Sequence, residues 1–170
     1  MKNSQEERLP KKILDPGQFY MGHHSMLVST ILGSCVSIIL LHKKSNFVTM
    51  CHALLPKCPF DFHQHQKTKQ QQCFRYVDSA IHSMLAIFRE KSIQYTDIEV
   101  KLFGGADMYA TTPTTVTIGE QNIAVAKHII KEQKLNMVSE DVGGAEGRVI
   151  HLKTDSGKVF LKRIKNNTFS

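Results

Sequence analysis

The feature that most constrains the fold of this chain is a pair of apolar, β-branched runs joined by a short polar turn. Residues 36–42 (VSIILLH) and 47–54 (FVTMCHAL) are rich in residues that favour strands. The KKSN stretch at residues 43–46 is a turn signal. Two such runs around one turn predict an antiparallel hairpin, and the first run is apolar enough to be a buried strand.

The rest of the sequence predicts two helices and several more strands. Apolar residues recur at steps of three and four in residues 74–91 and in residues 119–134, which is the amphipathic helix pattern. Further strands are predicted at residues 26–30, 97–108, 135–144, 148–153 and 159–164. This order of strands and helices predicts an α+β or layered α/β fold rather than a doubly wound parallel sheet.

The size of the chain favours one domain. It has 170 residues, of which 41% are hydrophobic, enough for one conventional core. We expect a flexible segment at residues 1–15, a single domain at 16–165 and a tail at 166–170. Four cysteines are too few for a disulfide scaffold, and no apolar run fits a signal peptide or a membrane helix. We therefore expect a cytoplasmic protein with reduced thiols that does not insert into a membrane.

The formal net charge of +7 permits binding to nucleic acid or to an acidic protein surface. The lysines and arginines fall mainly at both termini and around residues 67–69, and the chain has no tryptophan and no aromatic RNA-binding motif. We therefore expect no nucleic-acid partner. The positive charge suits docking to an acidic protein surface.

A thiol that directly follows a Gly-Ser turn is the first candidate for chemistry. Cys35 stands at the start of a predicted strand, where a side chain is presented at the rim of a sheet. A free thiol is mostly protonated at neutral pH, so a nucleophilic cysteine needs a nearby base. His52 lies on the next predicted strand, and the hairpin brings the two residues near each other. A hydroxyl from Ser29 or Thr30 is available to orient the imidazole.

The same residues also fit a purely structural role. Free cysteine is among the most buried residue types, and a lone histidine is more often half-buried and satisfied than catalytic. A zinc site is a further alternative, because the chain has several possible ligands at Cys51, Cys58, His63, His65 and Cys73. No C-x2-C pair is present, so we expect no metal.

Several long motifs together resemble one protein family. The stretches LGSCVSIIL, CHALLP, RYVDSAI, KLFGGADM, IGEQNIAVAKHII and EDVGGAEGRVIHLKTDSGKV, in this order over residues 16–164, are similar to the CheD chemoreceptor glutamine deamidases. The resemblance implies a layered α/β sandwich with mixed β-sheets flanked by two or three helices, like the catalytic domain of the cytotoxic necrotizing factor toxins. It also implies conversion of selected glutamines in methyl-accepting chemotaxis receptors to glutamate, and in some members hydrolysis of receptor methyl esters.

The resemblance assigns roles to particular residues. It places the nucleophile at Cys35 and the histidine at His52, and it implies a cysteine thioester intermediate without a metal or organic cofactor. The family usually has threonine six positions before the cysteine, where this chain has Ser29, so Ser29 is the expected orienting residue and Thr30 the alternative. The backbone N–H groups of Gly33, Ser34 and Cys35 are the expected oxyanion donors.

The resemblance also implies a CheC-type phosphatase as a binding partner. An alternative function follows, in which the chain is a non-catalytic regulator of such a phosphatase. Two glycine-rich turns match no phosphate-binding fingerprint and are the expected substrate or partner contacts. Their residues are Phe103, Gly104, Gly105, Ala106, Gly143 and Gly144. The chain departs from the family at Ala145 and Glu146, where an asparagine is common after the second glycine pair, and in a longer, more basic loop at residues 56–73.

Overall fold

The computed structural model describes residues 9–59, 73–108 and 115–164. Its strands are β1 (Lys11–Ile13), β2 (Phe19–Gly22), β3 (Leu27–Leu32), β4 (Val36–His42), β5 (Phe47–Cys51), β6 (Glu99–Gly104), β7 (Asn136–Val142), β8 (Gly147–Lys153) and β9 (Lys158–Ile164). Its α-helices are α1 (Val77–Glu90) and α2 (Ile118–Glu132). No helix of these residues is both long enough and apolar enough to span a membrane.

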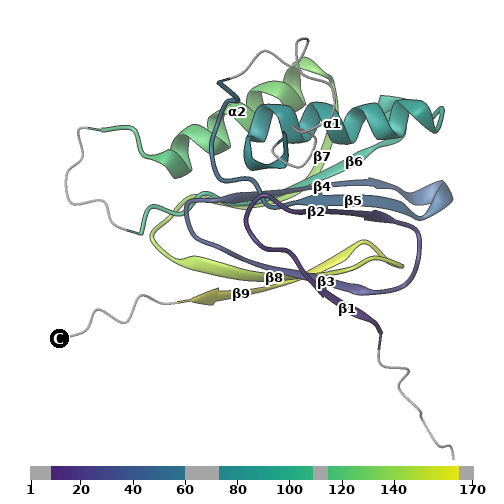
Figure 1. The fold of residues 1–170 in the computed structure, drawn as a ribbon, viewed down its shortest axis with the longest axis horizontal. Coiled ribbons are helices and arrows are strands. Elements are labelled where there is room, and N and C mark those ends of the chain that lie inside the picture. The colour runs from purple at the N-terminus through teal and green to yellow at the C-terminus, as the bar shows by residue number, and fades with distance from the viewer. Residues whose placement is uncertain (1–8, 60–72, 109–114, 165–170) are drawn as a thin grey trace, which may run out of the picture.

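The described elements form three layers (Figure 1). A five-stranded central sheet has the order β2-β5-β4-β6-β7, and a four-stranded outer sheet has the order β1-β3-β8-β9. Both sheets contain parallel and antiparallel pairs. Helices α1 and α2 cover one face of the central sheet, and the outer sheet covers the other (Figure 1). The predicted α+β class with mixed sheets is confirmed, while the likeness to the toxin domain stays a prediction.

Strand β4 is apolar along its whole length because it separates two hydrophobic cores. Side chains alternate across a strand, so successive residues enter different layers. The core under the helices takes Val36, Ile38 and Leu40, and the core between the sheets takes Ile39 and Leu41. Each fully buried Ile or Leu contributes about 1.5–3 kcal/mol of transfer free energy. The predicted hairpin is confirmed, with β4 and β5 paired antiparallel around the turn that follows His42.

The two predicted helices are confirmed with slightly different ends. Helix α1 buries its apolar face against the central sheet, with Ile81, Met84 and Phe88 among the buried residues. Helix α2 begins with a capping box, in which Thr117 accepts from the Glu120 backbone and the Glu120 side chain accepts from the Thr117 backbone. This pairing satisfies two backbone donors that the first helical turn otherwise leaves free.

Two strands near the N-terminus were not predicted. Strand β1 lies within the segment expected to be flexible, and it pairs parallel with β3 from Lys11↔Leu27 to Ile13↔Ser29. Strand β2 pairs antiparallel with β5. All three residues of β1 are exposed, and β2 has only four residues. Neither strand therefore shows a clear alternation of apolar and polar residues in the sequence. Their pairing depends on strands that are distant in sequence.

Candidate active site

Cys35 and His52 lie on adjacent segments of the chain, beside the turn that joins the outer sheet to the central sheet. Cys35 ends the turn that leads from β3 in the outer sheet to β4 in the central sheet, and His52 directly follows β5. An antiparallel bridge joins the next residues, with Val36 N–H donating to the Ala53 carbonyl at 2.9 Å and Ala53 N–H donating back at 2.9 Å. In this register Cys35 and His52 are diagonal neighbours on the same face, a relation in which Cα atoms are typically about 7–8 Å apart.

A buried threonine holds the imidazole of His52. Thr30, on the inward face of β3, lies 2.7 Å through its Oγ1 from Nδ1 of His52, and both residues are buried. The same hydroxyl donates its proton to the carbonyl of Leu14 at 2.7 Å. Since a hydroxyl has one proton, Thr30 must accept from His52, so Nδ1 carries the imidazole proton. The Leu14 carbonyl, 3.3 Å from Nδ1, also faces this N–H.

This arrangement leaves the second ring nitrogen of His52 unprotonated. Nε2 is buried and has no hydrogen-bond partner among the described residues. Burial lowers the pKa of His52 below its ordinary value of 6.5, although the Leu14 carbonyl and the charge of Asp15 oppose this shift. The imidazole is therefore neutral at neutral pH, with a free lone pair on Nε2 that suits a general base.

Cys35 is a protonated thiol rather than a preformed thiolate. Its side chain is half-buried, and burial raises its pKa above the ordinary value of 9.0, while its own backbone N–H lowers it. Cys51, by contrast, is fully buried, which raises its pKa to about 12. Of these two thiols only Cys35 reaches solvent, and a base must remove its proton before it attacks a carbonyl.

Ser29, the expected orienting residue, does not contact His52. Neighbouring residues of a strand point to opposite faces, so Ser29 faces away from the site while Thr30 faces into it. The Oγ of Ser29 lies 2.6 Å from Nδ1 of His151, its direct partner on β8. The hydrogen-bond geometry therefore favours Thr30, the alternative, over Ser29 as the orienting residue.

The first glycine pair, Gly104 and Gly105, supports the turn that ends at Cys35. Gly105 N–H donates to the Cys35 carbonyl, and Ala106 N–H donates to the Gly33 carbonyl, both at 2.8 Å. Gly104 has a φ of +107°, and a Cβ there would overlap the Cys35 carbonyl oxygen. Glycine is therefore required by both conformation and space.

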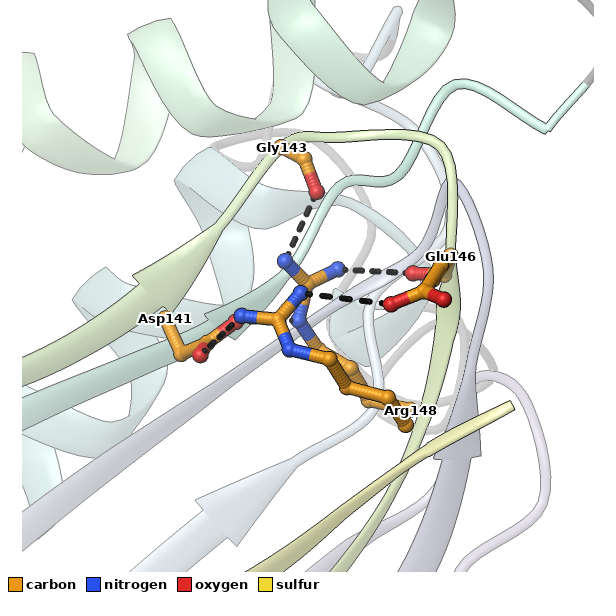
Figure 2. Close-up of polar contacts among 5 residues, drawn as sticks. Asp141, Gly143, Glu146 and Arg148 are labelled. Atoms are coloured by element: carbon orange, nitrogen blue, oxygen red, sulfur yellow. Dashed lines mark hydrogen bonds and ion pairs between the residues drawn. The ribbon is translucent and has the colours of Figure 1, made fainter. Parts of the chain in front are cut away.

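The second glycine pair supports the first. Gly143 N–H donates to the Gly104 carbonyl at 2.9 Å, and Asp107 N–H donates to the Gly144 carbonyl at 2.8 Å. Arg148, almost fully buried on β8, fixes the shape of this second turn (Figure 2). It donates from Nε to Asp141 at 2.6 Å and from Nη2 to the Gly143 carbonyl at 2.7 Å. A third bond, from Nη1, reaches the Glu146 carbonyl at 3.2 Å.

The expected contact residues therefore divide into two groups. Phe103 is buried in the core between the sheets, and Gly104, Gly105 and Ala106 are also buried. These four residues pack inside the molecule, and this burial does not favour a contact role for them. Of the second pair, Gly143 is half-buried and Gly144 is exposed.

Asn122 is a site residue that the sequence reasoning missed. It is fully buried on α2, and its Nδ2 donates to the carbonyls of Ser34 and Leu54, both at 2.9 Å. One side chain thus joins the turn before Cys35 to the segment after His52. A signal was available, because Asn122 lies in the helical stripe of Gly119, Asn122, Ala126 and Ile129, where a polar residue needs a buried partner.

The described residues offer no metal-binding cluster. No three His, Cys, Asp or Glu side chains gather among residues 9–59, 73–108 and 115–164 in an arrangement that could hold an ion. His63 and His65, which belonged to the zinc alternative, lie outside the described residues, as do residues 60–72 of the long basic loop.

Comparison with known proteins points to one family. The family described as CheD chemotactic sensory transduction matches residues 54–163. A protein of Geobacter sulfurreducens named probable chemoreceptor glutamine deamidase CheD 2 is 38% identical over 157 residues, which cover 92% of each chain. Similarly named proteins of Sulfurimonas denitrificans and Pyrococcus abyssi are 32% and 33% identical, over 94% and 87% of this chain and 97% and 88% of theirs.

Proposed function

This chain belongs to the CheD family, and we propose that it is a chemoreceptor glutamine deamidase. Its substrates are selected glutamines of methyl-accepting chemotaxis receptors, and its product is glutamate. The observation that carries the chemistry is the Thr30–His52 hydrogen bond, which leaves Nε2 of a neutral imidazole free, on the same face as the half-exposed thiol of Cys35. The names of the relatives supply the substrate class.

The first half of the reaction forms a thioester. Nε2 of His52 takes the proton of Cys35 as the sulfur attacks the side-chain amide carbon, and the carbonyl electrons move to oxygen. When the tetrahedral intermediate collapses, the C–N bond breaks and the proton on Nε2 passes to the leaving ammonia. The glutamyl group is then bound to Cys35 as a thioester, and the imidazole is neutral again.

The second half hydrolyses that thioester. Nε2 of His52 removes a proton from water as the water oxygen attacks the thioester carbon. Collapse breaks the C–S bond, and the proton on Nε2 returns to the sulfur, so the free thiol is restored and glutamate leaves. Hydrolysis of a receptor methyl ester follows the same steps with methanol as the leaving group. None of these steps needs a metal or an organic cofactor.

The turn before the nucleophile provides the oxyanion donors. Among the described residues, no backbone hydrogen bond engages the N–H of Ser34 or Cys35, so both are available to a developing negative charge. Asn122 holds the Ser34 carbonyl, and because the peptide is planar and trans, the Cys35 N–H points the opposite way. Each such donor stabilises an acyl-transfer transition state by about 3 kcal/mol.

The test of this function is direct. The purified chain is incubated with a soluble cytoplasmic fragment of a methyl-accepting chemotaxis receptor from the same organism, and released ammonia is measured. Mass-spectrometric mapping then locates each Gln-to-Glu conversion. Conversion at defined glutamines, with stoichiometric ammonia, is the expected result, and its absence with folded enzyme contradicts the proposal. A CheC-type phosphatase is the expected further partner, and its effect on turnover is measured in the same assay.

Replacing Thr30 and Ser29 one at a time separates the roles of their two hydroxyl groups. Thr30→Val keeps the shape of the side chain but removes the acceptor for the Nδ1 proton of His52, so we expect kcat to fall about 10-fold. Thr30→Ser should restore most of the activity. Ser29→Ala is the matched control and should leave kcat unchanged. A loss in Ser29→Ala with full activity in Thr30→Val would show that the hydrogen bond to Thr30 does not orient the base.

Asn122→Ala is expected to lower both stability and kcat. It removes two hydrogen bonds to carbonyls at the site, at a cost of about 1–3 kcal/mol in the free energy of unfolding. Because the Ser34–Cys35 peptide is no longer held, we expect kcat to fall with little change in KM. Asn136→Ala, at an exposed position on β7, is the control. A stability loss with unchanged kcat would limit Asn122 to a structural role.

A further inference from the structure

One face of the outer sheet is covered by none of the described elements (Figure 1). We call it the open face. The strand register places Ile13, Ser29, His151 and Phe160 in one row across β1, β3, β8 and β9. Because side chains alternate, all four point to the side opposite Thr30 and the core between the sheets.

The open face is unusually apolar. Nine large hydrophobic side chains are exposed among the described residues, and four of them lie here. They are Ile13, Ile31, Phe160 and Ile164, with exposed fractions of 71%, 63%, 56% and 37%. The two polar residues of the same row bond to each other, with Oγ of Ser29 2.6 Å from Nδ1 of His151. Apolar side chains gathered on one surface mark interaction sites more often than scattered ones do.

The charged residues of the open face are lysines. The four strands of the outer sheet contain seven lysines and arginines and no aspartate or glutamate. Lys11, Leu27, Lys153 and Lys158 form one row across the open face, and Lys162 lies further along β9. Of these four lysines, Lys153 contacts Asp155 at 3.5 Å, and no ion pair of the described residues involves the other three.

The position of these residues links them to the site. Strand β3 starts at the lysine row with Leu27, passes Ile31 and leads into the turn that ends at Cys35. Measured along β3, the apolar part of the open face therefore lies between the lysine row and the turn that ends at Cys35. The distance along β3 is about 20 Å at 3.3 Å per residue, and the four strands are about 14 Å wide. An α-helix, about 10–12 Å across, fits this width.

Resting on the proposed function, we propose that the open face is the docking surface for an acidic, amphipathic helix of the receptor substrate. The apolar side of that helix covers Ile31 and Phe160, and its acidic residues meet the lysine row. A helix of about 13 residues spans the distance from the lysine row to the turn. A second copy of this chain does not suit the surface, because it would bring one lysine row against another.

Disruption of the open face should raise KM and leave kcat unchanged. Phe160→Glu and Lys158→Glu each place a negative charge on the open face, far from the reacting atoms. We expect each to raise KM for the receptor fragment about 10-fold with kcat unchanged, since charge and apolar anchors act on association. Val138→Glu and Lys131→Glu make the same exchanges at exposed positions outside the outer sheet and should change neither constant. Alkylation of Cys35 by iodoacetamide should proceed at the wild-type rate in all four variants.

Binding measurements separate this proposal from the deamidase assignment. The dissociation constant of a fluorescently labelled receptor fragment is measured for wild type and for the four variants. Weaker binding in Phe160→Glu and Lys158→Glu alone supports docking, even if wild type converts no glutamine. Wild-type affinity and KM in those two variants would overturn it. It would also be overturned if these variants lost only self-association or only binding to anionic lipid vesicles while still binding the receptor fragment normally.

Discussion

Replacing Cys35 with alanine is expected to abolish glutamine conversion while leaving the fold intact. The thiol is the protein nucleophile in the proposed mechanism, so its loss removes the thioester path, and removal of a catalytic nucleophile costs about 10³-fold or more in kcat. The fold should tolerate the change because the side chain is half-buried at a turn and its backbone contacts remain. Ammonia release and mapped Gln-to-Glu conversion measure the loss, and thermal unfolding checks the fold.

Two further cysteine variants make this test specific. Cys35→Ser keeps a hydroxyl of similar size, but a serine hydroxyl is a weaker nucleophile in a site built around a thiol, so we expect nearly the same loss as with alanine. Cys58→Ala, at another half-buried cysteine, should keep full activity. Full deamidase activity in Cys35→Ala would exclude Cys35 as the nucleophile and favour the non-catalytic regulator of a CheC-type phosphatase.

The elements that were predictable are those whose signals are local. The β4–β5 hairpin, both helices and the closing β8–β9 hairpin each carry their own apolar periodicity or turn residues. Strands β1 and β2 do not, because each is short and its partner lies elsewhere in the sequence. Local pattern therefore predicted the element types, whereas membership of the two sheets depends on long-range pairing.

The site shows the same limit at the level of single residues. The pairing of Cys35 with His52 was predictable as a hypothesis, because a short hairpin brings close together the residues that flank its turn. The choice between Ser29 and Thr30 was not, since it depends on which face of β3 meets His52 across the gap between the sheets. The burial of Phe103 has the same cause, because the core between the sheets forms only when the outer sheet packs on the central one.

The residues that support the site could not be predicted from the sequence, for a different reason. Asn122, Arg148 and the glycine pairs act mainly on backbone carbonyls and N–H groups, which carry no sequence signature. The glycine pairs were predicted as tight turns, but their backbone partners are distant in sequence: Gly105 bonds to the Cys35 carbonyl, and Gly143 bonds to the Gly104 carbonyl.

His52→Gln is expected to reduce kcat by about 10²–10⁴-fold, the contribution of a positioned general base. Glutamine retains an N–H for Thr30 and the Leu14 carbonyl, so the loss reports the missing base more than a lost packing contact. His82→Gln, on the exposed side of α1, is the matched control and should be neutral. Activity of His52→Gln close to wild type would exclude His52 as the base.

The pH dependence tests the charge state of the same pair. Burial lowers the pKa of His52, so kcat/KM should fall on acidification with a midpoint below 6.5, where Nε2 becomes protonated. The native state binds fewer protons than the unfolded state in this range, so stability also decreases as the pH falls below 6.5. Burial raises the pKa of Cys35, so its alkylation by iodoacetamide should increase up to and beyond pH 9.0. Fast alkylation that is constant from pH 5 to pH 8 would instead show a preformed thiolate–imidazolium pair, and His52 would then hold the proton before substrate arrives.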